Sequence, residues 1–339
     1  MRVLLTKPEA GIAYDITSAC AKVTWSGSAS SPCRQATFDY LNAPYDNVLK
    51  IPTVSTGDFV SLVDDTAGEI FYGEIFGVER SSQIGTITYT AVDMMKNLLE
   101  SKGQYVFRNV TPEAVAAQVC ADAQIPTRFL YPTGVNIKTL ICDDMSLHDV
   151  IMAAYTKAHK ITGKKFFPMI YKRGFSVYRT KWYVDGMTLS EDTNIFSSSI
   201  TESVDKLVNV VKVYDKKGVQ IGEQRIDESV KKYGVFQDNY TVEDGIDPSI
   251  ASYHMLNVKP SQSIKISAIG DTNCISCYYV PVHDSATGLD GKYWISSDSH
   301  TWENGNHKMD LELQFEAIMS EVKAEEEKET KKTKKEAKK

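Results

Sequence analysis

The sequence lacks several features that mark whole classes of protein. Only six cysteines occur in 339 residues, too few for a disulfide-rich secreted domain. No stretch approaches the roughly 18 apolar residues that cross a bilayer, and residues 1–7 contain no apolar core of a secretory signal. We therefore expect a protein made and kept soluble in a reducing cytosol, without membrane insertion. The thiols are expected to be free: Cys20, Cys33, Cys120, Cys142, Cys274 and Cys277.

An excess of positive charge is also missing. The net charge is −6, and it is unevenly distributed. Residues 321–339 hold eight lysines and six glutamates, so the first 320 residues carry 30 basic and 38 acidic side chains, a net charge of −8. An acidic body argues against the broad cationic face that binds nucleic acid regardless of sequence. We predict no specific nucleic-acid binding.

Motifs for metal binding are scarce. Cys274 and Cys277, with His300 and His307 downstream, are the one set that resembles a four-ligand zinc site. However, the segment around the cysteines is predicted to be a strand, in which residues three apart point to opposite faces. A metal site is therefore the weaker interpretation.

Two further patterns are better explained by structure than by chemistry. The adjacent carboxylates Asp64-Asp65 and Asp143-Asp144 could be imagined as a glycosidase pair, but such pairs are typical of turns and helix starts. The string Thr162-Gly-Lys-Lys165 lacks the first glycine and the final hydroxyl residue of a phosphate-binding loop.

A thiol and an imidazole could also form a nucleophile and its base. The candidates are Cys120 and Cys142 with His148 or His159. Cys120 lies on the apolar stripe of a predicted helix, so packing explains it better. We therefore predict no catalytic residue, no cofactor-binding residue, no metal ligand and no cofactor.

Strand patterns are abundant near the N-terminus. Residues 23–26 and 34–40 predict a hairpin with a loose tip at 27–32, and strands follow at 59–63, 69–79 and 86–92. Gly73 and Gly77 inside one strand indicate bulges or sharp curvature. Short strands at this spacing favour a barrel or a sandwich.

The pattern changes to a helical period in the middle of the chain. Thr111-Pro112 predicts the start of a helix that ends before Pro126, and Ser146 predicts a second helix that Gly163 ends. Residues 165–173 and 175–178 then predict a hairpin that turns at 172–174. This region is expected to be a small α+β domain.

Strand patterns return from about residue 200. A hairpin is expected at 207–214 and 219–226, helix with variable sequence at 228–260, and strands at 263–269 and 275–282. A last hairpin pairs 293–297 with 308–315. Its final strand alternates strictly, which predicts that four apolar side chains point inward: Met309, Leu311, Leu313 and Phe315. Residues 73–89 faintly resemble 291–313, which suggests an internal duplication.

Nine strings along the chain, taken in order, carry a resemblance to known proteins. They lie at residues 25–27, 34–38, 73–77, 89–93, 119–126, 162–167, 270–271, 291–300 and 308–315. Together they resemble the XkdQ/YqbQ group of phage tail proteins and, more remotely, the late-control-D, VgrG and myophage baseplate-hub families. The resemblance covers nearly all of residues 20–316, and the order of the strings over this length is what makes it specific.

The resemblance implies a mainly β fold with an α+β part: tube-type β-barrels at residues 1–95 and 196–318, related by duplication, with the α+β domain at 96–195 between them. Residues 319–339 would be a charged tail, helical or disordered. It also implies a homotrimeric structural baseplate hub of a phage, prophage or bacteriocin particle. Such a hub joins a central spike or needle to the tail tube, initiates the tube and carries no catalytic residue. It contacts other baseplate proteins, and the tape measure protein is a further candidate partner.

Two other functions stay open at this point. The first is a cell-wall hydrolase of the tail tip, which would need an active site inside the body. The second is a carbohydrate-binding or tail-fibre module, which is favoured by 18 tyrosines, 12 phenylalanines and 4 tryptophans but disfavoured by the lack of fibrous repeats. For a hub, the acidic body predicts a tube bore that repels a passing polyanion.

Overall fold

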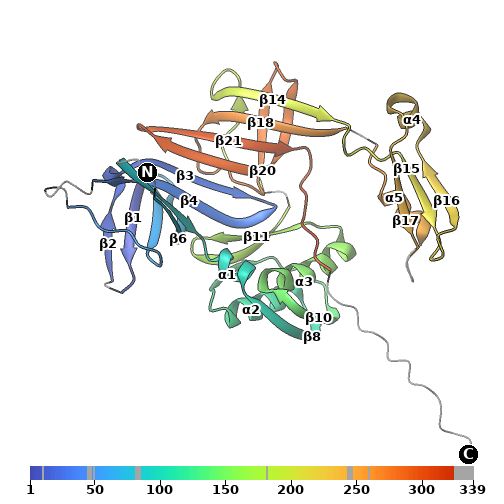
Figure 1. Ribbon diagram of the computed structural model, residues 1–339, viewed down its shortest axis with the longest axis horizontal. Helices are drawn as coiled ribbons and strands as arrows, with labels where there is room; N and C mark the ends of the chain where they lie inside the picture. Colours follow the sequence, from blue (N-terminus) through green and yellow to red (C-terminus); the bar gives the residue numbers. More distant parts are fainter. Residues whose placement is uncertain are drawn as a thin grey trace, which may run out of the picture. The chain divides into compact units, whose positions relative to one another are not determined.

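The computed structural model describes residues 1–9, 11–43, 48, 50–80, 85–180, 182–242, 247–258 and 260–323. It comprises two compact units (Figure 1). One unit contains Met1–Ser198 and the chain from Ile266 onward, and the other contains Ser199–Lys265. The mainly β fold is confirmed. No helix in these described ranges is both long and apolar enough to cross a bilayer.

Two sets of five strands in the sheet have the same order. The first set is β3 (Cys20–Ser28), β4 (Ser31–Asn42), β5 (Phe59–Asp64), β6 (Gly68–Glu79) and β7 (Gly85–Val92). The second set is β14 (Ile195–Ser203), β18 (Ser261–Ile269), β19 (Tyr279–Asp284), β20 (Leu289–Glu303) and β21 (Asn306–Gln314). Numbered along the chain, each set lies in the spatial order first, second, fifth, fourth, third. This repeated order agrees with an internal duplication, and the faintly similar segments at 73–89 and 291–313 are the fourth and fifth strands of each set.

Backbone hydrogen bonds join the two sets into one sheet. Ser297–Glu303 of β20 pairs antiparallel with Lys22–Ser28 of β3. Among the residues that the structure describes, the strand pairs follow open paths and neither set closes on itself. The expected barrels therefore differ from closed rings, because β20 occupies the edge of β3. Short strands extend the flanks: β1 (Arg2–Lys7) and β2 (Ile12–Asp15) beside β5, and β13 (Leu189–Ser190) beside β19, with a 3-10 turn at Thr17–Ala19.

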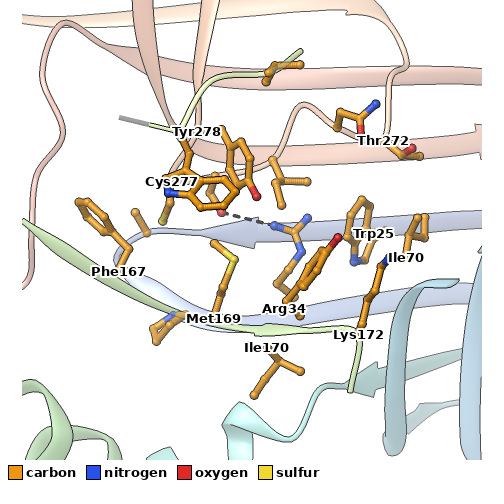
Figure 2. Close-up of a pocket in the computed structure, with 18 of the residues that line it drawn as sticks. Trp25, Arg34, Ile70, Phe167, Met169, Ile170, Lys172, Thr272, Cys277 and Tyr278 are labelled. Carbon is orange, nitrogen blue, oxygen red and sulfur yellow. Dashed lines mark hydrogen bonds between the residues drawn. The ribbon is translucent and has the colours of Figure 1, made fainter. Parts of the chain in front are cut away.

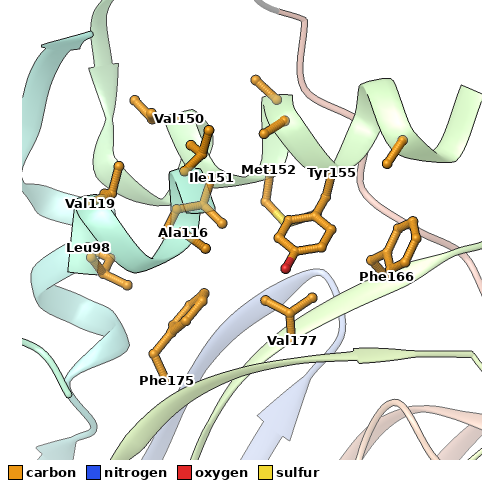
Figure 3. Close-up of a cluster of buried hydrophobic side chains, with 14 of the residues drawn as sticks. Leu98, Ala116, Val119, Val150, Ile151, Met152, Tyr155, Phe166, Phe175 and Val177 are labelled. Atoms are coloured by element: carbon orange, nitrogen blue, oxygen red, sulfur yellow. The ribbon is translucent and has the colours of Figure 1, made fainter. Parts of the chain in front are cut away.

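The α+β region packs around two capped helices (Figure 3). The hydroxyl of Thr111 accepts from Ala114 N at the start of α2, and that of Ser146 accepts from Asp149 N at the start of α3, while Gly163 ends α3 with φ +66°. These starts and stops confirm the helix predictions. The elements are α1 (Met95–Glu100), β8 (Lys102–Val110), α2 (Pro112–Asp122), β9 (Thr127–Leu130), β10 (Ile137–Ser146), α3 (Leu147–Thr162), β11 (Phe166–Tyr171) and β12 (Gly174–Arg179).

The second unit is inserted between the first and second strands of the second set. Its sheet order is β16 (Gln220–Arg225), β15 (Val210–Tyr214), β17 (Gln237–Thr241), with helices α4 (Asp227–Tyr233) and α5 (Pro248–His254). The hairpin prediction is confirmed. The expected helical stretch at 228–260 is instead two short helices around a strand, because Gly234 follows α4 at φ +84° and Asp247 starts α5 by accepting from Ser249 N.

Three local predictions are wrong. The tip of the first hairpin is tight, since β3 and β4 leave only Ala29 and Ser30 between them, and Ala29 N donates to Ser296 O over 2.9 Å. Residues 275–278 form turns before β19, with Cys277 at φ +75°. Phe315 is 51% exposed, because β21 ends at Gln314 and strand alternation no longer applies to it.

The chain after β21 packs against the α+β region. Ala317 and Met319 are buried in the same core as helices α2 and α3. Met319 Sδ accepts from Phe166 N over 3.3 Å, and Thr156 Oγ1 accepts from Val322 N over 3.0 Å. Residues 316–323 are therefore an anchored segment without helix or strand, which corrects the expected helical or disordered tail at 319–323. The rest of that tail, 324–339, lies outside the described residues.

Candidate functional site

The junction between β3 and β20 contains a buried ion pair. Arg34 on β4 reaches across β3 to Asp298 on β20, and both residues are buried. Gly27, which pairs with Asp298 in the strand register, lies beneath the arginine side chain. A Cβ at this glycine would stand 2.3 Å from Arg34 Nη1. The missing side chain therefore gives the guanidinium its path between the two sets of strands.

The geometry of the pair is bidentate. Arg34 Nη1 donates to Asp298 Oδ1 over 2.9 Å and Nη2 donates to Oδ2 over 2.5 Å. Ser276 N donates to Asp298 Oδ1 over 2.7 Å, and the ring of Trp25 lies 4.0 Å from Arg34 Cζ. A buried pair of this kind contributes specificity more reliably than net stability, but breaking it leaves an uncompensated charge. It therefore fixes how the two sets of strands join.

Two histidines continue the junction beside the ion pair. His300 Nε2 lies 3.1 Å from the carbonyl oxygen of Cys274, which can only accept, so Nε2 carries the proton. His300 Nδ1 then accepts from His307 Nε2 over 3.1 Å. Burial lowers the pKa of His300, and burial together with the neighbouring His300 lowers the pKa of His307 to about 4. Both rings are thus neutral near pH 7 and act as packing and hydrogen-bonding groups.

A cavity of about 400 Å³ opens beside this junction (Figure 2). Its walls come from the β3–β4 hairpin, from β11, and from segments 182–185 and 272–278. Figure 2 shows Arg34 between Trp25 and the segment that carries Cys277 and Tyr278. The size lies within the range of ligand pockets. Its aromatic and hydrogen-bonding lining suits binding, and it lies where three parts of the first unit meet.

A buried carboxylate links the first set of strands to the helices. Asp93 follows β7, and its Oδ1 accepts from Met95 N over 3.0 Å at the start of α1, while Oδ2 accepts from Arg34 N over 3.2 Å. Burial raises the pKa of Asp93 to about 7, although these backbone donors favour the charged form. The same stretch of β4 therefore contacts both Asp93 and Asp298.

The residues of the imagined zinc site are only partly brought together. His300 and His307 are in contact, but Cys274 Sγ lies 3.4 Å from Met187 Sδ. Burial raises the pKa of both Cys274 and Cys277, the latter to about 12, so the thiols hold their protons. Within the ranges described, no three His, Cys, Asp or Glu side chains are grouped as metal ligands.

The adjacent aspartates have structural partners. Asp64 Oδ1 accepts from Thr66 N and Ala67 N in the turn after β5. Asp143 accepts from Gln104 Nε2 over 2.6 Å and Asp144 from Lys102 Nζ over 2.9 Å, at a bulge in β10. The second pair is therefore in a strand and not at a helix start, which corrects its interpretation.

The remaining candidates also have local partners. Thr162–Lys165 lies at the C-terminal end of α3, the opposite end from a phosphate-binding helix start. Cys120 and Cys142 are buried in the α+β core, which confirms the packing interpretation of Cys120. His148 contacts Asp149 and His159 contacts the carbonyl of Lys164.

Sequence reasoning missed the ion pair, although strand phase carried a signal. Arg34 has the same phase in β4 as the buried Ala36 and Phe38, and Asp298 has the same phase in β20 as the buried His300. Charged residues at inward positions of two strands indicate a buried pair. Which side chains of β20 point inward could be predicted only when the strand was known to extend over 15 residues.

The fold is shared with solved structures of phage tail proteins. The structure is similar to that of the 43 kDa tail protein of prophage MuSo2 from Shewanella oneidensis, with a TM-score of 0.70 and 13% identity. The match covers 93% of this chain and 98% of that protein. The chain belongs to the YQBQ-like family, whose sequence model matches residues 23–314.

Two relatives from Bacillus subtilis strain 168 have similar sequences. YqbQ, an uncharacterized protein, is 28% identical over 273 residues, which are 77% of this chain and 82% of YqbQ. XkdQ, a protein of the phage-like element PBSX, is 26% identical over 282 residues, which are 79% of this chain and 85% of XkdQ. The range matched by the family model, residues 23–314, runs from β3 to β21 and so includes both strands of the junction.

Proposed function

We propose that this protein is the structural hub of the baseplate in a phage tail or phage-tail-like contractile particle. The observation that carries the proposal is the repeated strand order, two five-stranded sets joined through β3 and β20. Membership of the YQBQ-like family and the likeness to a prophage tail protein support a role in a tail. The hub would assemble in the bacterial cytoplasm and become part of the particle.

The repeat suits a symmetry adaptor. A chain with two equivalent tube-type domains presents six such domains when three copies form a ring, so a homotrimer can join a threefold spike to a sixfold tube. In this proposal the tube-type domains are residues 1–95 and 196–318, and the α+β domain at 96–195 separates them. The partners would be a central spike or needle protein, the tail tube protein and other baseplate proteins.

The proposed role is association without catalysis. The imagined thiol, imidazole and carboxylate groups have hydrogen-bond or packing partners within the described residues. This supports a structural role over a peptidoglycan hydrolase. Zymography on bacterial cell walls separates the two: we expect no cleared band from the purified chain, and a cleared band would favour the hydrolase.

Electron microscopy of intact particles tests the hub directly. We expect three copies around the tail axis, between the spike and the first ring of the tube. Density for this chain away from the axis, or as a single copy, would contradict the proposal. An atomic model built into the same map identifies the side chains that line the bore, which we expect to be mainly acidic.

A further inference from the structure

We infer that the outer edge of β6 at residues 77–79 pairs with the outer edge of β14 in a second copy of this chain. This inference rests on the proposed function, which requires copies to form a ring, and it names the strands that join them. The junction within one chain, β20 with β3, serves as the template. In the repeat, β6 is the equivalent of β20, and β14 is the equivalent of β3.

The equivalence of β6 and β20 extends to single residues. Against the fifth strand, β6 shifts register between Ile75 and Gly77, and β20 shifts between Ile295 and Ser297. On the other side, Ile75 N donates to Asp58 O over 2.8 Å and its oxygen accepts from Gly57 N.

Ile295 makes the same pair of bonds in the second set. Its N donates to Tyr278 O over 2.8 Å, and its oxygen accepts from Cys277 N over 2.9 Å. Gly77, Val78 and Glu79 therefore stand in the places of Ser297, Asp298 and Ser299, which are the residues that pair with β3.

Both equivalent edges lack a strand in the part of the chain that the structure describes. Gly77–Glu79 pairs with β7 on one side, and β5 ends its pairing with β6 at Glu74. Among the described residues, β14 has β18 as its strand neighbour on one side and none on the other. Unpaired backbone N–H and C=O groups along a strand are a template for another strand. Within one chain, the first strand of the first set pairs with the fourth strand of the second set. The two free edges offer the reverse combination, the first strand of the second set and the fourth strand of the first set.

Apolar side chains are exposed on both strands. Phe76 on β6 is 50% exposed and Phe196 on β14 is 62% exposed. Large aromatic side chains exposed on unpaired edge strands favour burial against a partner. A head-to-tail contact of this kind uses two different surfaces of each copy, and it closes into a ring when the rotation permits.

The contact between copies differs from the template in its charges. Val78 is the equivalent in β6 of Asp298, which accepts hydrogen bonds from Arg34 in the junction within the chain. Strand pairing between copies at Val78 therefore buries no ion pair. Removing charges from water is the main cost of such a pair. The junction within the chain is thus specified by the ion pair, and the junction between copies by backbone pairing and apolar burial.

Cysteine crosslinking in assembled particles tests the pairing. Glu79→Cys is combined in turn with Ile200→Cys, Thr201→Cys or Glu202→Cys, and particles from the producing strain are oxidised and run on a non-reducing gel. We expect a ladder up to a covalent trimer for at least one combination, reversed by reductant. The matched control is Glu79→Cys with Lys22→Cys, because β20 already occupies the edge of β3.

The outcomes separate this inference from the hub itself. Three copies on the axis without crosslinks in any β6–β14 combination would overturn the strand assignment and leave the hub standing. Crosslinks between Thr201→Cys and Tyr14→Cys, which lies on the edge strand β2, would also overturn it. If unmodified particles show no ring of this chain, the proposed function fails first.

Discussion

At the scale of single residues, the ion pair between Arg34 and Asp298 fixes the junction. We expect Asp298→Asn to lower the free energy of unfolding by about 3–5 kcal/mol, because it leaves a buried guanidinium without its counter-charge. Denaturant titration of the purified chain measures the change. Asp310→Asn is the control, since Asp310 forms an ion pair with Lys308 at the surface of β21. Its effect should stay within about 0.5 kcal/mol, and equal losses for both variants would contradict the assignment.

Asp93 gives the stability a specific pH dependence. Burial raises its pKa to about 7 in the folded state, whereas the unfolded value is about 3.9. The folded chain therefore holds the proton more tightly, and this group's contribution to stability falls as pH rises from about 4 to about 7. We expect Asp93→Asn to remove that decline.

The difference in unfolding free energy between Asp93→Asn and the parent separates the contribution of Asp93 from that of the buried histidines. The lowered pKa values of His300 and His307 act in the opposite sense, because both neutral folded rings resist protonation and their contribution to stability is lost as pH falls below about 6.5. Urea titrations at a series of pH values should show that the free energy of unfolding of the variant increases relative to that of the parent as pH rises. A difference that does not change with pH would refute the buried-carboxylate account.

At the scale of elements, the segment at 316–323 fastens the end of the second set to the helices. We expect Met319→Ala to cost about 2–4 kcal/mol of unfolding free energy, because Met319 is buried in the α+β core. The neighbouring Ile318 is 59% exposed, so Ile318→Ala should change little. Thermal melts of both variants compare them, and a similar loss for each would mean that the segment is not anchored as described.

Elements with local signals could be predicted from the sequence. Thr111, Ser146 and Gly163 mark helix ends by bonds within four residues, so their patterns needed no tertiary knowledge. The alternation of β21 was equally local. The turn at 275–278 was misread because its apolar residues contact distant segments, and Ser276 N is held by Asp298.

The candidate site was less predictable for the same reason. Arg34 and Asp298 are 264 residues apart in the sequence, and no periodic pattern links them. Two inward-facing charges give the signal, but their partnership depends on β3 pairing with β20. Met319 was assigned to a charged tail because composition averages over residues 319–339 hide single anchoring side chains.

At the scale of the whole molecule, the second unit is an insertion in a hairpin. In the first set, β3 and β4 are joined by Ala29 and Ser30 alone, whereas β14 and β18 enclose residues 204–260. We expect that replacing 205–259 with an Asn-Gly turn leaves a chain that folds cooperatively. Calorimetry and circular dichroism check this. Insoluble or molten protein would show that the first unit depends on the insertion.

The pairing of β3 with β20 also sets an order of events during synthesis. At elongation rates of roughly 5–20 residues per second, β3 leaves the ribosome roughly 13–54 seconds before the part of β20 that pairs with it. For that interval the edge of β3 is open, and Lys22 near its start supplies the kind of charge that discourages aggregation between strands. The nascent chain therefore cannot present its completed sheet until translation is nearly finished.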